Sequence, residues 1–178
     1  MRPILIGIGG AHSGCGKTTF ASLILQRVKG LGAIKYTKTS LYSSVTGDIE
    51  VLSQEGKDTK RLLDSGAEKV LWVKSSYDDL PETLRIAIRD LSHLKGIIIE
   101  GNSAVEVLQP DIVIFIAGTE TERFKENAQN ILKTANLVIY DDEPPPEIPE
   151  SAQRFQRNDK KGFLNVLEIL LKECEKGA

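Results

Sequence analysis

Short apolar runs alternate with helix-like segments along most of the chain. The runs read ILIGIG at 4–9, AIKYT at 33–37, KVLWVKS at 69–75, GIIIEG at 96–101, DIVIFIAG at 111–118 and NLVIYDDE at 136–143. Such alternation is typical of βαβ units around a parallel sheet. Continuous apolar runs predict strands that are buried on both faces. The expected fold class is α/β, a three-layer α/β/α sandwich with a mainly parallel sheet.

The segments between the runs carry apolar residues at helical spacing. A helix is expected after Lys17, ending at Gly30 and Gly32, followed by helices over 56–67 and 80–94. A further helix is expected behind a capping box of Thr119 and Glu122, and a last one enters at Asn158 or Asp159. The apolar positions of these helices are Phe20, Leu23, Ile24, Val28, Leu84, Ile88, Leu91, Phe124, Ala128, Ile131, Leu132, Phe163, Val166, Leu167, Leu170, Leu171 and Cys174.

Two stretches lack this periodicity. Residues 37–55 are rich in Ser, Thr, Gly and Asp and predict a long loop, with a broken hairpin as the alternative. Loops of that length in a compact domain are usually functional or mobile. The segment EPPPEIP at 143–149 predicts a stiff surface linker within one domain, because its prolines favour extended backbone.

Composition narrows the class of protein. The 178 residues, 40% hydrophobic and 27% charged, suit one domain over 1–178. A net charge of −2 does not favour nucleic acid or a membrane surface as partner. Cys15 and Cys174 do not suggest a disulfide framework, and no apolar run matches a signal peptide or a membrane span. We therefore expect a cytoplasmic protein.

A glycine-rich segment, GGAHSGCGKTTF at 9–20, lies directly between the first strand and the first helix. It matches the phosphate-binding pattern G-x-x-x-x-G-K-[ST], except that Ala11 stands at the first glycine. Such a loop turns backbone N–H groups toward phosphate, and a small residue suffices at its first position. The expected nucleotide-binding residues are Ser13, Gly14, Cys15, Gly16, Lys17, Thr18 and Thr19.

Individual side chains of this loop have separate expected roles. Lys17 would reach the β- and γ-phosphates, and the Thr18 hydroxyl would hold Mg²⁺ at the start of the helix. Cys15 is read as a small loop residue rather than a reactive thiol, and His12 as a partly exposed imidazole. The cofactors expected are Mg²⁺ and either GTP or ATP.

Further candidates lie where other strands end. Glu100 follows an apolar strand and is expected to bind the magnesium ion or orient a water, with helix capping as the alternative. Asp58 begins a helix, where a cap and a metal contact are both open. Lys35, Thr37 and Lys38 are candidates for contact with a γ-phosphate or an anionic second substrate. Asp111 precedes its strand and is expected to be structural at the opposite edge.

Taken in order, HSGCGKTT, GAIKYTK, GKDTKRLLDSGAEKV and GIIIEGN resemble the molybdopterin-guanine dinucleotide biosynthesis protein B family. The resemblance covers about the first hundred residues and implies a P-loop NTPase fold. It assigns Gly14, Gly16, Lys17, Thr18 and Thr19 to nucleotide and magnesium. Lys35, Thr37, Asp58 and Glu100 match its other motifs, and the implied catalytic residues are Lys17, Asp58 and Glu100.

The resemblance also implies partners. It suggests weak GTP hydrolysis, a homodimer, and a role in molybdenum cofactor biosynthesis beside molybdopterin and a guanylyltransferase. The chain departs from the family where paired histidines would follow Lys35, and again after Gly101. No N-K-x-D motif for guanine is present, although Asp141 or Asp142 lies at a late strand end where a base could sit.

Other classes of function remain open from the sequence. A small-molecule kinase would need lid cations, for which Arg123, Lys125, Arg154 and Arg157 are candidates. A binding module whose nucleotide only stabilises a dimer would show no meaningful turnover. An ATP-dependent ligase of the dethiobiotin-synthetase type could hold its substrate in the loop near 38–55.

Overall fold

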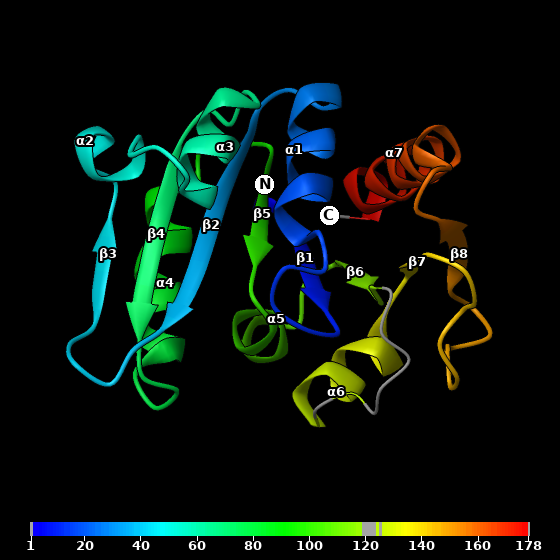
Figure 1. Ribbon diagram of the computed structural model, residues 1–178. Coiled ribbons are helices and arrows are strands. Elements are labelled where there is room, and N and C mark those ends of the chain that lie inside the picture. The colour runs from blue at the N-terminus through cyan, green and yellow to red at the C-terminus, as the bar shows by residue number, and fades with distance from the viewer. Residues whose placement is uncertain (1, 119–123, 125, 178) are drawn as a thin grey trace.

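The protein folds as an eight-stranded sheet with helices on both faces (Figure 1). The computed structural model describes residues 2–118, 124 and 126–177. The strand order is β3-β4-β2-β5-β1-β6-β7-β8, and every neighbouring pair is parallel except β3 with β4. The α/β class and its three-layer arrangement are therefore confirmed.

The elements follow the sequence pattern closely. The strands are β1 (Ile4–Gly10), β2 (Leu31–Lys38), β3 (Ser44–Thr46), β4 (Val70–Ser75), β5 (Gly96–Glu100), β6 (Ile112–Ile116), β7 (Leu137–Tyr140) and β8 (Gln153–Gln156). The helices are α1 (Lys17–Arg27), α2 (Ile49–Leu52), α3 (Asp58–Asp64), α4 (Leu80–Asp90), α5 (Asn102–Leu108), α6 (Glu126–Thr134) and α7 (Lys160–Gly177).

The helices bury their apolar stripes against opposite faces of the sheet. α1, α3 and α7 pack on one face, where Phe20 and Phe163 meet edge to face with ring centroids 5.3 Å apart. α4, α5 and α6 pack on the other face through two further apolar clusters. The central strands β1, β5 and β6 contribute to both faces, which is why they are apolar except for Glu100 at the end of β5.

Several elements differ from the sequence prediction. Residues 37–55 are not one loop: β2 extends to Lys38, and β3 and α2 follow. β3 pairs with β4 and not with β2, the strand that precedes it in the chain. The prediction of a simple loop was therefore wrong, and the alternative of a broken hairpin had not named β4 as a partner. α5 and β8 were missed, because α5 follows β5 with only Gly101 between them and β8 is four residues long. Thr119 and Glu122 lie outside the described residues.

The amino ends of the strands are closed by Asp111. Its carboxylate accepts a hydrogen bond from the Leu5 backbone N–H at 2.8 Å and pairs with Arg2 at 2.5 Å. The structural role expected for Asp111 is thereby confirmed. The candidate functional site lies at the opposite edge of the sheet, at the carboxyl ends of the strands. In the described part of the chain, no helix is both long and apolar enough to cross a bilayer.

Candidate functional site

The glycine-rich loop, residues 11–16, leads from the carboxyl end of β1 into α1. Gly14 and Gly16 take positive φ angles of 79° and 105°, which favour glycine because it has no Cβ. No side chain caps the first turn of α1. The first backbone N–H groups of α1 have no hydrogen-bond partner within the helix, and they form the positive end of the helix dipole. This arrangement can bind an anion.

The start of the loop is closely packed. A Cβ on Gly10 would lie 2.3 Å from the Cys15 sulfur, and Cys15 is buried. Ala11 donates its N–H to the Ile116 carbonyl at 2.9 Å. Among the described residues other than glycine, positive φ is limited to Gln109 and Glu147, so Ala11 needs no glycine-like backbone. Cys15 is thus a buried packing residue, as the sequence suggested.

Lys17 reaches back across the loop. Its Nζ donates to the His12 carbonyl oxygen at 2.7 Å and lies 3.6 Å from the Cys15 sulfur. The imidazole of His12 contacts the Ser13 carbonyl oxygen through Nδ1 at 2.7 Å, while its buried Nε2 has no hydrogen-bond partner among the described residues. The ammonium group therefore lies inside the curve of the loop, where an anion would be neutralised.

Beside the loop, four side chains form a connected polar cluster. The Thr18 hydroxyl donates to the Glu100 carboxylate, with oxygen distances of 2.9 and 3.0 Å. Lys35 Nζ donates to the same carboxylate at 2.5 Å and to Asp58 at 2.6 Å. Glu100 is only 1% exposed, so its charge is neutralised here and not by water.

The positions of the strands explain this meeting. In the sheet, Glu100 lies opposite Ile8 of β1 on one side and Lys35 of β2 on the other. Thr18 comes from the first turn of α1 and Asp58 from the first turn of α3. The N-cap of α3 is Lys57, and the Asp58 carboxylate accepts from Lys35 at 2.6 Å, so Asp58 takes part in the cluster from the first turn of the helix.

Two competing effects set the pKa values in the cluster. Burial alone would lower the pKa of Lys35, but the charge of Glu100 and hydrogen bonds to Asp58 and Glu100 outweigh it and raise the pKa. Burial would raise the pKa of Asp58, yet the hydrogen bond and charge of Lys35 lower it overall. Lys35 and Asp58 are therefore both charged over the neutral range.

A further cation reaches the site from α3. Arg61 donates through Nη2 to the Thr19 hydroxyl at 3.1 Å, and its Nη1 lies 3.8 Å from the Asp58 carboxylate. Sequence reasoning missed this residue. The spacing Asp58-x-x-Arg61 places both side chains on one side of the helix and was the available signal.

Asn102 fixes the point where β1 ends. Its amide oxygen accepts from the Gly10 N–H at 3.0 Å, and its amide nitrogen donates to the Gly10 carbonyl at 2.9 Å. This pair of bonds satisfies backbone groups at the strand end and ties the loop to α5. Sequence reasoning missed Asn102, and the available signal was its position directly after Glu100 and Gly101.

Another cation, Arg157, comes from a distant part of the sequence. Arg157 pairs with both carboxylate oxygens of Asp141, at 2.6 and 2.9 Å, and donates to the Cys15 carbonyl at 3.0 Å. Its guanidinium would lie 2.6 Å from a Cβ on Gly16, so Arg157 packs directly against this glycine, whose positive φ already disfavours other residues. Of the cations considered for a kinase lid, Arg157 contacts the loop, whereas Arg154 is exposed on β8. Arg123 and Lys125 lie outside the described residues.

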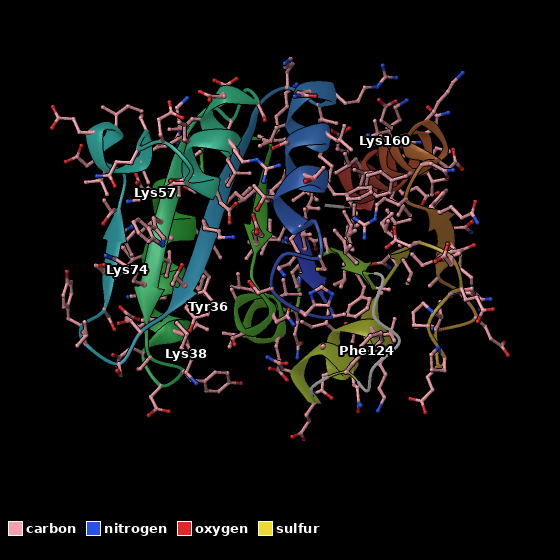
Figure 2. The ribbon with its side chains drawn as sticks, in the orientation of Figure 1. Tyr36, Lys38, Lys57, Lys74, Phe124 and Lys160 are labelled. Atoms are coloured by element: carbon pink, nitrogen blue, oxygen red, sulfur yellow. The ribbon has the colours of Figure 1, made fainter. Side chains whose placement is uncertain are left out.

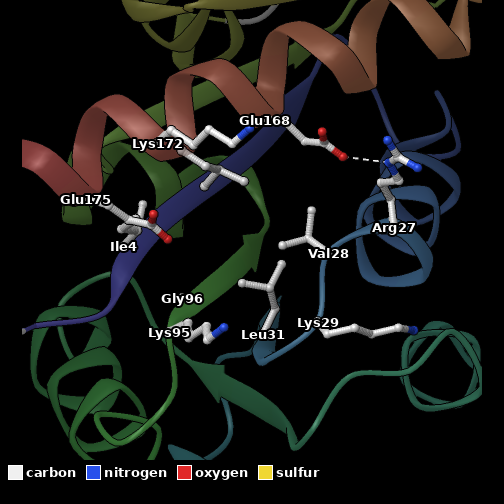
Figure 3. A pocket seen from close by; sticks show the side chains of 11 residues that line it. Ile4, Arg27, Val28, Lys29, Leu31, Lys95, Gly96, Glu168, Lys172 and Glu175 are labelled. Carbon is white, nitrogen blue, oxygen red and sulfur yellow. Dashed lines mark hydrogen bonds and ion pairs between the residues drawn. The ribbon is translucent and has the colours of Figure 1, made fainter.

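Two of the cavities lined by described residues lie at opposite ends of the sheet. One of about 160 Å³, here called the loop pocket, is lined by Ser13, Gly14, Gly16, Lys17, Thr18, Thr19, Lys35, Asp58, Arg61 and Glu100. The other, of about 310 Å³, lies between α1, α7 and the amino ends of the strands and is here called the amino-end pocket (Figure 3). The smaller cavity holds the candidate chemistry, and most of the residues predicted from the sequence line it.

The remaining candidates on β2 are divided between the two faces of the sheet. Lys35 and Thr37 lie on the face packed by α1 and α3, because they alternate with the buried residues Ile34 and Tyr36. Lys38 shares the opposite face with Tyr36. Lys35 therefore lines the loop pocket, and Thr37 lies beside the pocket on the same face of the sheet. Lys38 lies on the opposite face, away from the pocket.

The residues around Thr18 suit a magnesium ion. Mg²⁺ in nucleotide sites commonly uses one or two carboxylates together with waters and substrate phosphates. Thr18, Glu100 and Asp58 supply hydroxyl and carboxylate oxygens of that kind, and the ion would replace Lys35 as their counter-charge. Among the described residues, no three His, Cys, Asp or Glu side chains gather as a protein-only metal site.

Comparison with known proteins adds no family to this description. No family model matches the chain, and no curated sequence matches it.

Proposed function

We propose that this protein binds a nucleoside triphosphate with Mg²⁺ in the loop pocket and hydrolyses it slowly. The single observation that carries the proposal is the Thr18–Glu100 contact beside the glycine-rich loop. It joins the helix N-terminus that would hold phosphate to a buried carboxylate on the neighbouring strand. GTP is the leading nucleotide, on the strength of the family resemblance.

The residues of the loop pocket would divide the work of binding phosphate. Lys17 would exchange its hydrogen bond to the His12 carbonyl for one to a phosphate oxygen, and the first N–H groups of α1 would donate to the same group. Thr18 and Glu100 would hold Mg²⁺, which stabilises the negative charge of the transferring phosphoryl group when bound. Glu100 would also orient an attacking water.

Lys35 has a particular place in this proposal. It neutralises Glu100 and Asp58 in the absence of a divalent ion. If Thr18 and Glu100 held Mg²⁺, the Lys35 ammonium would be repelled by the ion and would be free to contact a phosphate oxygen or a second substrate. Lys35 would therefore link metal binding to the next step.

Transfer to a second substrate, as in a small-molecule kinase or an ATP-dependent ligase, is the second candidate function. The observation that favours it is the position of Lys35, which lines the loop pocket and shares its face of β2 with Thr37, where no helix in the described structure covers the carboxyl half of neighbouring β4 (Figure 1). A hydrolase that acts on water alone has no need of such a surface.

The molecule and the partner protein that this nucleotide-binding protein would serve are a further proposal. The resemblance of the first hundred residues supports a role beside molybdopterin and a guanylyltransferase, with a homodimer as the active form. Guanine recognition by Asp141 has become a less attractive hypothesis, since both of its carboxylate oxygens bind Arg157. Asp142 keeps that role as a prediction. Co-purification of molybdopterin or a guanylyltransferase with the protein tests the client directly.

A melting-temperature screen across nucleotides tests the main proposal. GTP with Mg²⁺ at about 100 times its dissociation constant should stabilise the protein by about 2.7 kcal/mol, or a few degrees, through mass action. Lys17→Ala should abolish the shift, and Lys172→Ala, exposed on α7, should leave it intact. Phosphate release that disappears in Lys17→Ala would establish turnover. Absence of a shift with both GTP and ATP at millimolar concentration contradicts the proposal.

A further inference from the structure

One face of the sheet beside the loop pocket carries cations, hydroxyl groups and the single tryptophan of the chain. It consists of Thr37, Ser44, Lys57, Trp72 and Lys74, and we call it the Trp72 face. Trp72 and Lys74 lie on β4, Thr37 on β2 and Ser44 on β3, and Lys57 directly precedes α3. On this side no helix in the described part of the chain lies over the carboxyl half of β4 and the start of β3 that pairs with it (Figure 1).

The alternation of the strands places these side chains together. Trp72 is opposite Lys35 in the parallel register, and Lys74 is opposite both Thr37 and Ser44. The indole Nε1 donates to the Thr37 hydroxyl at 3.0 Å, which joins β4 to β2 on this face. Because Lys35 lines the loop pocket, the Trp72 face continues directly from it.

The charge of this face is positive. Lys57 Nζ and Lys74 Nζ each lie 4.6 Å from the centre of the Trp72 ring, a distance at which a cation is attracted to an aromatic face. Figure 2 labels both lysines, which lie in front of β3 and β4. Among the described residues, neither lysine forms an ion pair with a carboxylate. By contrast, Lys35, which lies between the loop pocket and the Trp72 face, pairs with the two carboxylates of Asp58 and Glu100.

Hydroxyl groups accompany these cations. The Ser44 hydroxyl is buried and has no hydrogen-bond partner among the described residues. A buried polar group without a partner is costly, and an oxyanion bound beside Lys74 would accept a hydrogen bond from this hydroxyl. Cations held by an aromatic ring, with hydroxyl donors between them, form a surface suited to carboxylate or phosphate.

We propose that the Trp72 face binds a small anionic molecule that carries a carboxylate or phosphate group, and that it is the site of the second substrate. The ligand would lie on Lys57 and Lys74 and extend toward Lys35. The role as a second-substrate site rests on the proposed function, whereas the binding itself does not. Neutral or cationic molecules would not gain from these contacts.

The fluorescence of Trp72 gives a direct test, because no other tryptophan contributes. The protein is titrated with phenyl phosphate and with benzoate at constant ionic strength, and with benzyl alcohol as the neutral comparison. We expect saturable fluorescence changes with one or both anions and none with the alcohol. The anion that saturates at lower concentration distinguishes a phosphate ligand from a carboxylate ligand.

Matched variants locate the binding. The double variant Lys57→Gln/Lys74→Gln should raise the half-saturating concentration about tenfold, since two nearby cations are lost. Lys133→Gln/Lys172→Gln removes the same charge from exposed positions on α6 and α7 and should not change it. Half-saturating concentrations are compared, because loss of the lysines alters the starting fluorescence.

Lys17→Ala separates this face from the loop pocket. We expect the anion response to persist in that variant. A response that Lys17→Ala abolishes while Lys57→Gln/Lys74→Gln retains it places the anion in the loop pocket and overturns the proposal. Absence of any saturable response with either anion also overturns it. A persisting response in a protein that shows no nucleotide-dependent melting shift would contradict the nucleotide proposal and leave anion binding at the Trp72 face standing.

Discussion

The loop pocket and the amino-end pocket lie at opposite ends of the same strands and are built differently. In the loop pocket the Glu100 carboxylate is buried, and Lys35 and Thr18 satisfy it from two other elements. In the amino-end pocket, apolar side chains such as Ile4 and Leu31 form the floor, and charged groups stand around the rim (Figure 3). The larger cavity, the amino-end pocket, thus has no buried charged cluster like that of Glu100 among its described lining residues.

The difference follows from the direction of the chain. At the carboxyl ends of parallel strands, the chain passes into helix N-termini with free N–H groups, which attract anions. At the amino-end pocket α1 presents its C-terminus, where Arg27 suits the dipole and pairs with Glu168 at 2.5 Å. That ion pair is largely exposed, with side-chain exposures of 54% and 30%. Volume alone is therefore a poor guide to the site in this protein.

The largest expected effect compares the two glutamates. Glu100→Ala should lower the free energy of unfolding by about 3 kcal/mol, because it removes a buried partner of Lys35 and Thr18. Glu168→Ala should cost about 0.5 kcal/mol, since its ion pair with Arg27 is exposed to solvent and salt. Urea unfolding of both variants measures the difference. Equal losses of unfolding free energy would show that the buried contacts of Glu100 stabilise the fold no more than the Arg27–Glu168 ion pair does.

A smaller effect compares two arginines. Arg157→Ala should weaken binding of GTP with Mg²⁺ about tenfold, because the guanidinium that holds the Cys15 carbonyl and packs on Gly16 is lost. Arg27→Ala, at the other end of α1, should leave the affinity unchanged. Titration with a fluorescent GTP analogue measures both. Equal weakening by the two variants would mean that the amino-end pocket is coupled to the loop through α1.

The smallest effect concerns pH. The lowered pKa of Asp58 means that its ionised form stabilises the fold above its ordinary value of 3.8, and that this stability is lost as the pH falls through the lowered pKa. Lys35 has a raised pKa, so its contribution is complete below 10.5 and is lost only as the pH rises through the raised value.

Asp58→Asn should therefore flatten the fall in melting temperature below about pH 4. The difference should stay below about 1 kcal/mol, because the Asp58 side chain is 41% exposed. Asp90→Asn, which removes the exposed partner of Lys69 near the amino end, provides the control. An acid limb that is steeper in Asp58→Asn than in the unmodified protein would contradict the assigned role of Lys35.

Much of the fold was predictable because its signals are local. The strands predicted at 4–9, 96–101 and 111–118 have apolar runs too regular to mistake, and Asp159 begins the last helix as expected, with its carboxylate accepting from the Gly162 N–H. β3 and β8 were missed because three or four residues carry no periodicity of their own. They exist because an existing strand edge offers them hydrogen bonds.

The candidate site was predictable to the extent that its residues belong to motifs. Lys17, Thr18 and Glu100 follow directly from the glycine-rich segment and from a strand end. Arg157 could not be predicted to touch the loop, because it lies 142 residues from Cys15 along the chain. Its position depends on how β8 pairs with β7 at the edge of the sheet.

By itself, the sequence determined the alternation of strands and helices, the glycine-rich loop, and which carboxylates and lysines stand at strand ends. Periodicity and backbone preference act over a few residues, so they can be read without the fold. Only the tertiary structure decided that Lys35 sits between Glu100 and Asp58, that Lys38 faces the other way, and that Arg157 supports the loop. Those contacts depend on strand order and register, which join residues far apart in the chain.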